Sequence, residues 1–139
     1  MIPLSDLKAL CQQWASQDAN IAAIALVGSY ARGEAKDDSD VDLLVLTHRT
    51  FDPYFQNQAW LNRFGEPQDW MFEDYGAARS VRADFEWGEV EFCFATVLWA
   101  SVPLDEGSRR VLSGGAEIWV DHDGSFSNAL RIVREGPSS

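Results

Sequence analysis

The chain has 139 residues and a formal net charge of −11, from 22 acidic and 11 basic residues. This length suits a single domain over residues 1–139, and a hydrophobic content of 46% with six tryptophans is typical of a packed globule. The sequence has no basic stripe that could replace counterions on phosphates, so long nucleic acid is not an expected partner. The sequence shows no signal peptide and no apolar run of the roughly 18–20 residues that are needed to span a bilayer. We therefore expect a cytoplasmic location without membrane association.

The first part of the chain is expected to form a helix and two strands. The helix carries apolar residues at helical spacing, which are Leu7, Leu10, Cys11 and Trp14. Ser5 or Asp6 is expected to cap its N-terminus. Residues 21–27 form a continuous apolar run of strand length, which is typical of a central strand with both faces covered. After a polar stretch, residues 41–46 predict a second strand.

The remainder is expected to form a helix, a β-hairpin, a short strand and a last helix. Asp52, followed by proline, is typical of a helix N-cap, and Gly65 marks the end of that helix. Apolar and polar residues alternate over residues 79–96, which predicts a hairpin. Residues 116–120 predict a fifth strand, and Ser125 is expected to cap the last helix. The pattern predicts an α/β (α+β) domain with a mixed β-sheet flanked by helices. Four further tryptophans are assigned to the core by default, namely Trp60, Trp70, Trp99 and Trp119.

The most informative stretch joins the first two strands. Gly28 and Ser29 leave the first strand and open a helical turn, which lets the backbone approach a phosphate closely. Asp40 and Asp42 are two residues apart on a strand, so both side chains project from one face. Adjacent carboxylates repel each other unless a cation lies between them, and oxygen ligands without His or Cys favour Mg²⁺. The stretch therefore predicts a phosphate-binding turn beside a divalent-metal site.

A P-loop and a solvated surface loop are alternative interpretations of this stretch. Residues 28–33 contain the two glycines of a Walker A motif, but Glu34 and Ala35 stand where Lys and Ser or Thr are required. A P-loop is therefore excluded. The other interpretation is a surface loop capped by Ser39, with both aspartates merely solvated. An acid pair flanked by strand residues makes this second interpretation less favoured.

Residues 26–46 resemble the signature of the polymerase β-like nucleotidyltransferase superfamily. The pattern is a strand, Gly-Ser, a helical turn with Ala-Arg-Gly, and then Ser-Asp-x-Asp followed by apolar residues. It is most similar to the small bacterial minimal nucleotidyltransferases and to the catalytic domains of aminoglycoside nucleotidyltransferases. The resemblance implies the polymerase β-like fold and the transfer of a nucleoside monophosphate, AMP from ATP or the equivalent from another nucleoside triphosphate, to a hydroxyl acceptor. It assigns nucleotide binding to Gly28, Ser29, Arg32 and Ser39, with capping of its own helix as the equal alternative for Arg32.

The resemblance also implies a third carboxylate on a neighbouring strand, which binds metal and helps to activate the attacking hydroxyl. Glu91 is the preferred candidate because apolar residues flank it inside the strand, and Glu89 is the alternative. Asp40, Asp42 and Glu91 then form the catalytic and metal-binding set for two Mg²⁺ ions about 3.5–4 Å apart. Weaker candidates for contacting the leaving pyrophosphate are Lys36, Arg79 and Arg82.

The sequence leaves the acceptor and the partner open. The resemblance allows a small-molecule acceptor such as an antibiotic, or a partner protein, as in antitoxin-type minimal nucleotidyltransferases, whose usual partner is a helical HEPN toxin. A third alternative, a catalytically silent nucleotide-binding module, is disfavoured by the intact pair of Asp40 and Asp42. Because little chain follows the hairpin, a homodimer or a HEPN-type partner is expected to complete the acceptor site.

Overall fold

The computed structural model describes residues 3–35, 40–74, 78–100, 115–124, 126–129 and 131. Its elements in chain order are α1 (Leu4–Gln17), β1 (Ile21–Val27), α2 (Gly28–Arg32), β2 (Val41–Thr47), α3 (Pro53–Gln56), η1 (Ala59–Arg63), β3 (Asp69–Asp74), β4 (Arg79–Phe85), β5 (Gly88–Thr96), η2 (Val97–Ala100) and β6 (Glu117–Asp121). Residues 126–129 are helical, as predicted for the last helix, whereas its predicted cap, Ser125, lies outside the described residues.

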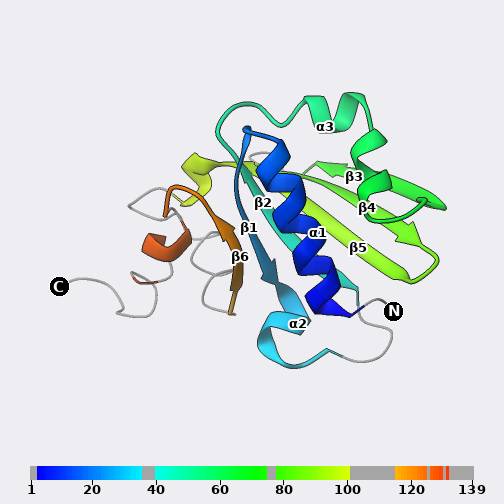
Figure 1. Ribbon diagram of the computed structural model, residues 1–139, viewed down its shortest axis with the longest axis horizontal. Helices are drawn as coiled ribbons and strands as arrows, with labels where there is room; N and C mark the ends of the chain where they lie inside the picture. Colours follow the sequence, from blue (N-terminus) through cyan, green and yellow to red (C-terminus); the bar gives the residue numbers. More distant parts are fainter. Residues whose placement is uncertain are drawn as a thin grey trace.

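Six strands form one mixed sheet in the order β3-β4-β5-β2-β1-β6 (Figure 1). Neighbouring strands pair antiparallel, except for β2 and β5, which are parallel. Parallel pairing places the starts of β2 and β5 at the same end of the sheet, which is also the end where α2 follows β1 (Figure 1). The predicted fold class, a mixed sheet with helices, is confirmed.

The face of the sheet that α1 covers holds the larger part of the core. Trp14 of α1 is 2% exposed and stacks on Trp60 with 5.1 Å between ring centroids. Four further rings meet Trp14 edge-on, those of Tyr54, Phe64, Phe92 and Phe94. Offset and edge-on aromatic pairs each add about 0.5–1.5 kcal/mol beyond the area that they bury. This aromatic face is therefore the main source of packing energy in the described part of the chain.

The opposite face is covered by smaller side chains. Its buried residues come from the middle strands and from the helical residues near the C-terminus, namely Ala23, Ala25, Leu44, Leu46, Ala95, Phe126 and Ala129. This second cluster covers one end of the face, and the polar residues of β2 and β5 lie toward the other end.

Two predicted helices differ from the observed ones. α1 begins at Leu4 and has no side-chain cap, so neither Ser5 nor Asp6 is the N-cap. The helix expected after Asp52 is two short helices, α3 and η1. They are separate because the backbone of Asn57 is extended, with φ −143° and ψ 120°. This break lets the aromatic residues before and after it turn toward Trp14.

One strand, β3 at the edge of the sheet, was not predicted from the sequence. Five of its six residues are exposed, so neither face of the strand has to be apolar. Its apolar and polar residues accordingly do not alternate. Trp70, which was assigned to the core, lies in this strand and is 44% exposed. Trp119 is buried as predicted, and the side chain of Trp99 lies outside the described residues.

Candidate active site

One row of side chains crosses the sheet on the face opposite α1. Backbone pairing places Met71 of β3 beside Arg82 of β4, Arg82 beside Glu91 of β5, and Glu91 beside Asp42 of β2. On its other side Asp42 pairs with Val27, the last residue of β1. Because alternate residues of a strand share a face, Glu89 lies on this face as well. We refer to Asp40, Asp42, Glu89 and Glu91 as the carboxylate cluster.

Gly28 determines how closely the backbone after β1 approaches Asp42. It has a φ of +75°, a conformation that residues with a Cβ atom rarely adopt. A Cβ atom at Gly28 would overlap Oδ2 of Asp42 and lie 3.1 Å from its Cγ. The Asp42 carboxylate therefore lies directly against the backbone at the start of α2. The predicted juxtaposition of the Gly-Ser turn and the acid pair is present in the structure.

Asp42 is half-buried among other acids, and this changes its protonation. Burial, followed by the nearby charges of Glu91 and Asp40, raises the pKa of Asp42 to about 6. Arg82 and Arg32 act in the opposite direction. A carboxyl whose pKa is raised by burial and by neighbouring acids has too little positive charge around it to balance its ionised form. The site therefore fits a cation, and its all-oxygen donor set suits Mg²⁺.

Arg82 connects the two candidates for the third carboxylate. Its Nη2 donates a hydrogen bond to Oε2 of Glu91 at 2.5 Å, and its Nε lies 3.3 Å from Oε1 of Glu89, without hydrogen-bond geometry. Glu89 also lies near Asp40, and burial followed by the charge of Asp40 raises the pKa of Glu89. Glu91 therefore lies beside Asp42, and Glu89 lies beside Asp40. In the described part of the chain, no three metal-binding side chains converge on one point.

The remaining predicted residues lie at different distances from this cluster. Ser29 is in the first turn of α2, next to Gly28. Arg32 is close enough to lower the pKa of Asp42, and its Nε also contacts Oε2 of Glu34 at 3.3 Å. Arg79 lies outside the site on the aromatic face, where its Nη1 is 3.5 Å from Oδ1 of Asp52. The other two predicted residues, Ser39 and Lys36, lie outside the described residues.

Arg82, a weaker candidate for contacting pyrophosphate, contacts Glu91, and this contact was not predicted from the sequence. A signal for this contact was available in the hairpin. Phe85 pairs with Gly88 around a two-residue turn, and counting outward from this pair along both strands places Arg82 opposite Glu91. Register within a hairpin follows from the length of its turn.

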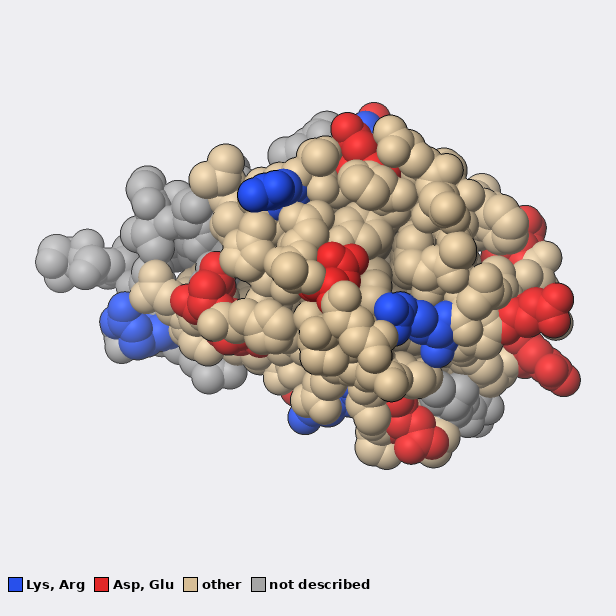
Figure 2. All heavy atoms as spheres, turned by 45° about the horizontal axis from the view of Figure 1, so that its top comes forward, with Lys and Arg blue, Asp and Glu red and all other residues tan. Residues whose placement is uncertain are grey.

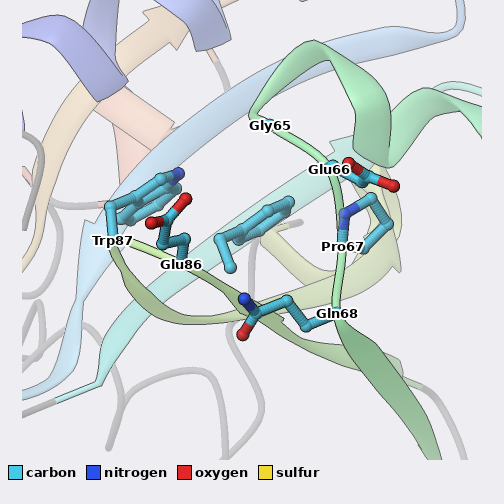
Figure 3. Close-up of a pocket in the computed structure, with 7 residues that line it drawn as sticks. Gly65, Glu66, Pro67, Gln68, Glu86 and Trp87 are labelled. Carbon is cyan, nitrogen blue, oxygen red and sulfur yellow. The ribbon is translucent and has the colours of Figure 1, made fainter.

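A separate hollow lies at the turn of the same hairpin, on the aromatic side of the sheet (Figure 3). It has a volume of about 500 Å³ and is lined by Gly65, Glu66, Pro67, Gln68, Phe85, Glu86 and Trp87. Trp87 stacks on Phe85 with 5.1 Å between centroids and donates a hydrogen bond to the carbonyl of Phe64. None of these residues belongs to the carboxylate cluster.

The distribution of charge agrees with the bulk composition. Figure 2 shows one face of the molecule, on which Lys and Arg side chains lie in separate small groups rather than in a continuous stripe. Among the strand residues that the structure describes, Arg82 is the only basic residue on the face of the carboxylate cluster. No helix within the described ranges is both long and apolar enough to cross a membrane.

A mixed sheet with an acid pair beside a Gly-Ser turn defines a protein of the nucleotidyl-transfer class. The family described as a nucleotidyltransferase domain matches residues 7–88, which is more than half of the chain. The chain belongs to this polymerase β-like nucleotidyltransferase family, a family of transferases. The match includes Gly28, Asp40 and Asp42, but it ends before Glu89 and Glu91.

A comparison with solved structures found similarity to a CCA-adding enzyme in complex with ATP. The two chains are 16% identical, with a TM-score of 0.48, and the similarity covers 91% of this chain. This chain spans 31% of the length of that protein. No sequence relative was found among curated proteins.

Proposed function

We propose that this protein transfers a nucleoside monophosphate from a Mg²⁺-bound nucleoside triphosphate, with ATP as the first candidate, to a hydroxyl acceptor. The observation that carries the proposal is the position of Asp42. It lies against the backbone of Gly28 on one side and beside Glu91 on the other. One carboxylate therefore adjoins both the candidate phosphate-binding turn and the candidate acceptor-activating acid.

Each part of the cluster has a distinct role in this proposal. The turn at Gly28 and Ser29 holds the triphosphate, because the first N–H groups of a helix have no acceptor inside the helix. Asp40 and Asp42 hold the divalent cation that the triphosphate brings with it. Glu91 lies on the acceptor side of the site. A carboxylate near the attacking hydroxyl group favours deprotonation of that hydroxyl. When bound, Mg²⁺ supplies positive charge that stabilises the triphosphate and the developing charge of the transition state.

The first test measures binding. Isothermal calorimetry with Mg²⁺–ATP compares the wild type with the double variant Asp40→Asn/Asp42→Asn. We expect the double variant to lose most of the affinity while remaining folded, because the cation loses its two charged ligands. The matched control is Asp69→Asn/Asp84→Asn, which removes the same charge from a cross-strand pair on the outer hairpin. We expect the control to bind within a few-fold of the wild type.

The second test measures the reaction. Pyrophosphate release and mass spectrometry of the products are followed with ATP, GTP, CTP and UTP and a panel of hydroxyl acceptors. Transfer that requires Asp42 supports the proposal. Equal nucleotide affinity in the wild type and the Asp40/Asp42 double variant would contradict it. Tight binding without transfer to any acceptor would identify a silent nucleotide-binding module instead.

We also propose that a second chain, another copy of this protein or a HEPN-type partner, completes the acceptor side. The side chain of Glu91 is 16% exposed, yet Met71 in the same cross-strand row is 56% exposed. Water close to the reacting groups weakens electrostatic stabilisation, so closure of this end would favour transfer. Light scattering combined with activity measurements over a wide dilution range tests the proposal. Full specific activity from a strictly monomeric protein would contradict it.

A further inference from the structure

Arg82 stands in an unusual position, because one cation is surrounded by three carboxylates from two strands, β3 and β5. Its Nη2 hydrogen-bonds to Glu91 of β5 at 2.5 Å and lies 3.9 Å from Oε1 of Glu73 on β3. Its Nε lies 3.3 Å from Oε1 of Glu89. These contacts make Arg82 the counterion of Glu91 in the described structure.

The contact between Arg82 and Glu91 is one-sided. Both the hydrogen bond and the ion pair use Oε2 of Glu91, and Oε1 accepts no hydrogen bond from the described residues. The Glu91 side chain is largely buried and its backbone is fixed by pairing with Arg82 on one side and Asp42 on the other. Fixing one oxygen therefore also fixes the direction of the other.

We propose that Arg82 is a positioning residue that holds Glu91 by Oε2 and keeps Oε1 available to the metal and the acceptor hydroxyl. This inference rests on the proposed function and adds to it a residue that touches neither nucleotide nor acceptor. Groups that orient a metal ligand through a hydrogen bond are commonly worth 10- to 100-fold in activity or metal affinity.

Arginine is better suited to this task than lysine. The rigid guanidinium presents separate nitrogen atoms to Glu91 and Glu89 at the same time, whereas an ammonium is a single mobile point charge. Arg82 therefore holds Glu91 by a hydrogen bond, places a positive charge beside Glu89, and reduces the repulsion between the two carboxylates. Lysine would restore the charge but not this geometry.

A purely electrostatic role for Arg82 predicts a different effect on metal binding and turnover than a positioning role does. If Arg82 merely competed with the metal for Glu91, its removal would raise metal affinity and raise or preserve turnover. If Arg82 positions Glu91, its removal lowers turnover even with nucleotide and metal saturating. Turnover and affinity therefore have to be measured separately.

The experiment compares Arg82→Gln and Arg82→Lys with the matched control Arg79→Gln, which changes an arginine of the same strand on the opposite face. We expect Arg82→Gln to lower kcat by about 10- to 100-fold while Mg²⁺–nucleotide affinity stays within about threefold. Arg82→Lys should recover only part of kcat, and Arg79→Gln should match the wild type. The double variant Arg82→Gln/Glu91→Gln should be no slower than Glu91→Gln alone, since both changes remove one function.

A readout without nucleotide tests the pair itself. With metal removed by EDTA, Arg82→Gln should lower the Tm by several degrees, because it leaves Glu91 partly buried without a partner. Adding Glu91→Gln to that variant should recover part of the loss. Additive effects of the two changes on Tm and on kcat would overturn the inference, as would an Arg82→Gln variant with wild-type kcat.

These outcomes separate this inference from the proposed function. A wild type that binds no Mg²⁺–nucleotide contradicts the proposed function and, with it, the role of Arg82. A wild type that transfers nucleotide, together with an Arg82→Gln variant of equal kcat, contradicts only the role of Arg82. Tighter metal binding with undiminished turnover in Arg82→Gln would show that Arg82 competes with the metal, which also overturns positioning.

Discussion

The two faces of the central sheet are built from different side chains. The face under α1 carries large rings around Trp14, including Phe92 and Phe94 of β5, which are both fully buried. The opposite face carries small apolar residues at one end and the carboxylate cluster at the other. One strand serves both, because β5 directs Phe92 to the aromatic face and Glu91 to the acidic one.

This difference shows how the fold can accommodate a destabilising site. Neighbouring acids repel each other, and burying a carboxylate costs free energy unless it is paired. Burial of aromatic rings is favourable by about 25 cal/mol per Å² of apolar surface. The aromatic face therefore offsets the free-energy cost of the acidic face, and the two faces should respond in opposite ways to the loss of a side chain.

The largest effect is expected on the aromatic face. Trp14→Ala should lower the free energy of unfolding by about 3–5 kcal/mol, the range for a large buried ring that leaves a cavity. The matched control is Trp70→Ala on β3, where the same substitution removes a ring that is already 44% exposed. Urea titrations should show a loss of less than about 1 kcal/mol for the control. Equal losses in the two variants would refute the contrast between buried and exposed tryptophans.

The next effect is expected where the backbone touches the acidic face. Gly28→Ala places a methyl group on the Asp42 carboxylate and should lower kcat by about 100-fold, or about 2.7 kcal/mol, with the overall fold retained. Gly33→Ala is the matched control. Gly33 also has a positive φ, of 72°, but a Cβ atom there would meet nothing within 4 Å. It should lose about 1 kcal/mol of stability through strain and keep its activity.

These two glycines also show what the sequence can predict. The turn at Gly28 and the pair of Asp40 and Asp42 lie close together in the chain, so local rules for glycine and for strand alternation were sufficient. The hairpin also follows from local alternation. The fold class and the aromatic orientation of β5 could be derived in the same way.

The remaining features depend on long-range register. Nothing local in the sequence determines that Asp42 pairs with Glu91. The strands that carry them, β2 and β5, are parallel, and α3, η1, β3 and β4 lie between them in the chain. The choice between Glu89 and Glu91 therefore stays a prediction. β3 was missed for another physical reason. An edge strand exposed on both faces has no alternation, so Trp70 looked like a core residue.

A smaller effect, of opposite sign, is expected for Asp42 itself. Its pKa is raised to about 6 in the folded protein from an ordinary 3.8, so the folded state binds a proton more readily than the unfolded chain. The stability that this group contributes is therefore present at low pH and is lost as the pH rises through about 6. In EDTA at pH 7.5, Asp42→Asn should raise the Tm by about 3 °C, as about 1 kcal/mol would in a domain of this size.

The pH dependence is the control for this prediction. At pH 4.5 the wild-type carboxyl is protonated in the folded protein, and most of the cost that accumulates between pH 3.8 and 6 is absent, so the gain from Asp42→Asn should be much smaller. Asp69→Asn removes one charge from an exposed position away from the carboxylate cluster and should show no such change with pH. Adding Mg²⁺–ATP should reverse the order, because a ligand stabilises only the protein that binds it. A gain in Tm that is the same at both pH values would contradict the assignment to Asp42.

The smallest effect is expected at the edge of the acidic face. Met71 belongs to the same row as Arg82, Glu91 and Asp42, but its side chain is 56% exposed, so little apolar contact is lost when it is replaced. Met71→Gln should change the free energy of unfolding by less than about 0.5 kcal/mol in urea titrations. Phe72→Ala is the neighbouring control, because its ring lies 5.3 Å from that of Phe55, and it should lose about 1 kcal/mol. A loss above 1 kcal/mol for Met71→Gln would mean that the packed region extends over β3. The edge of the acidic face at β3 would then be covered by other parts of the protein, although it is exposed among the described residues.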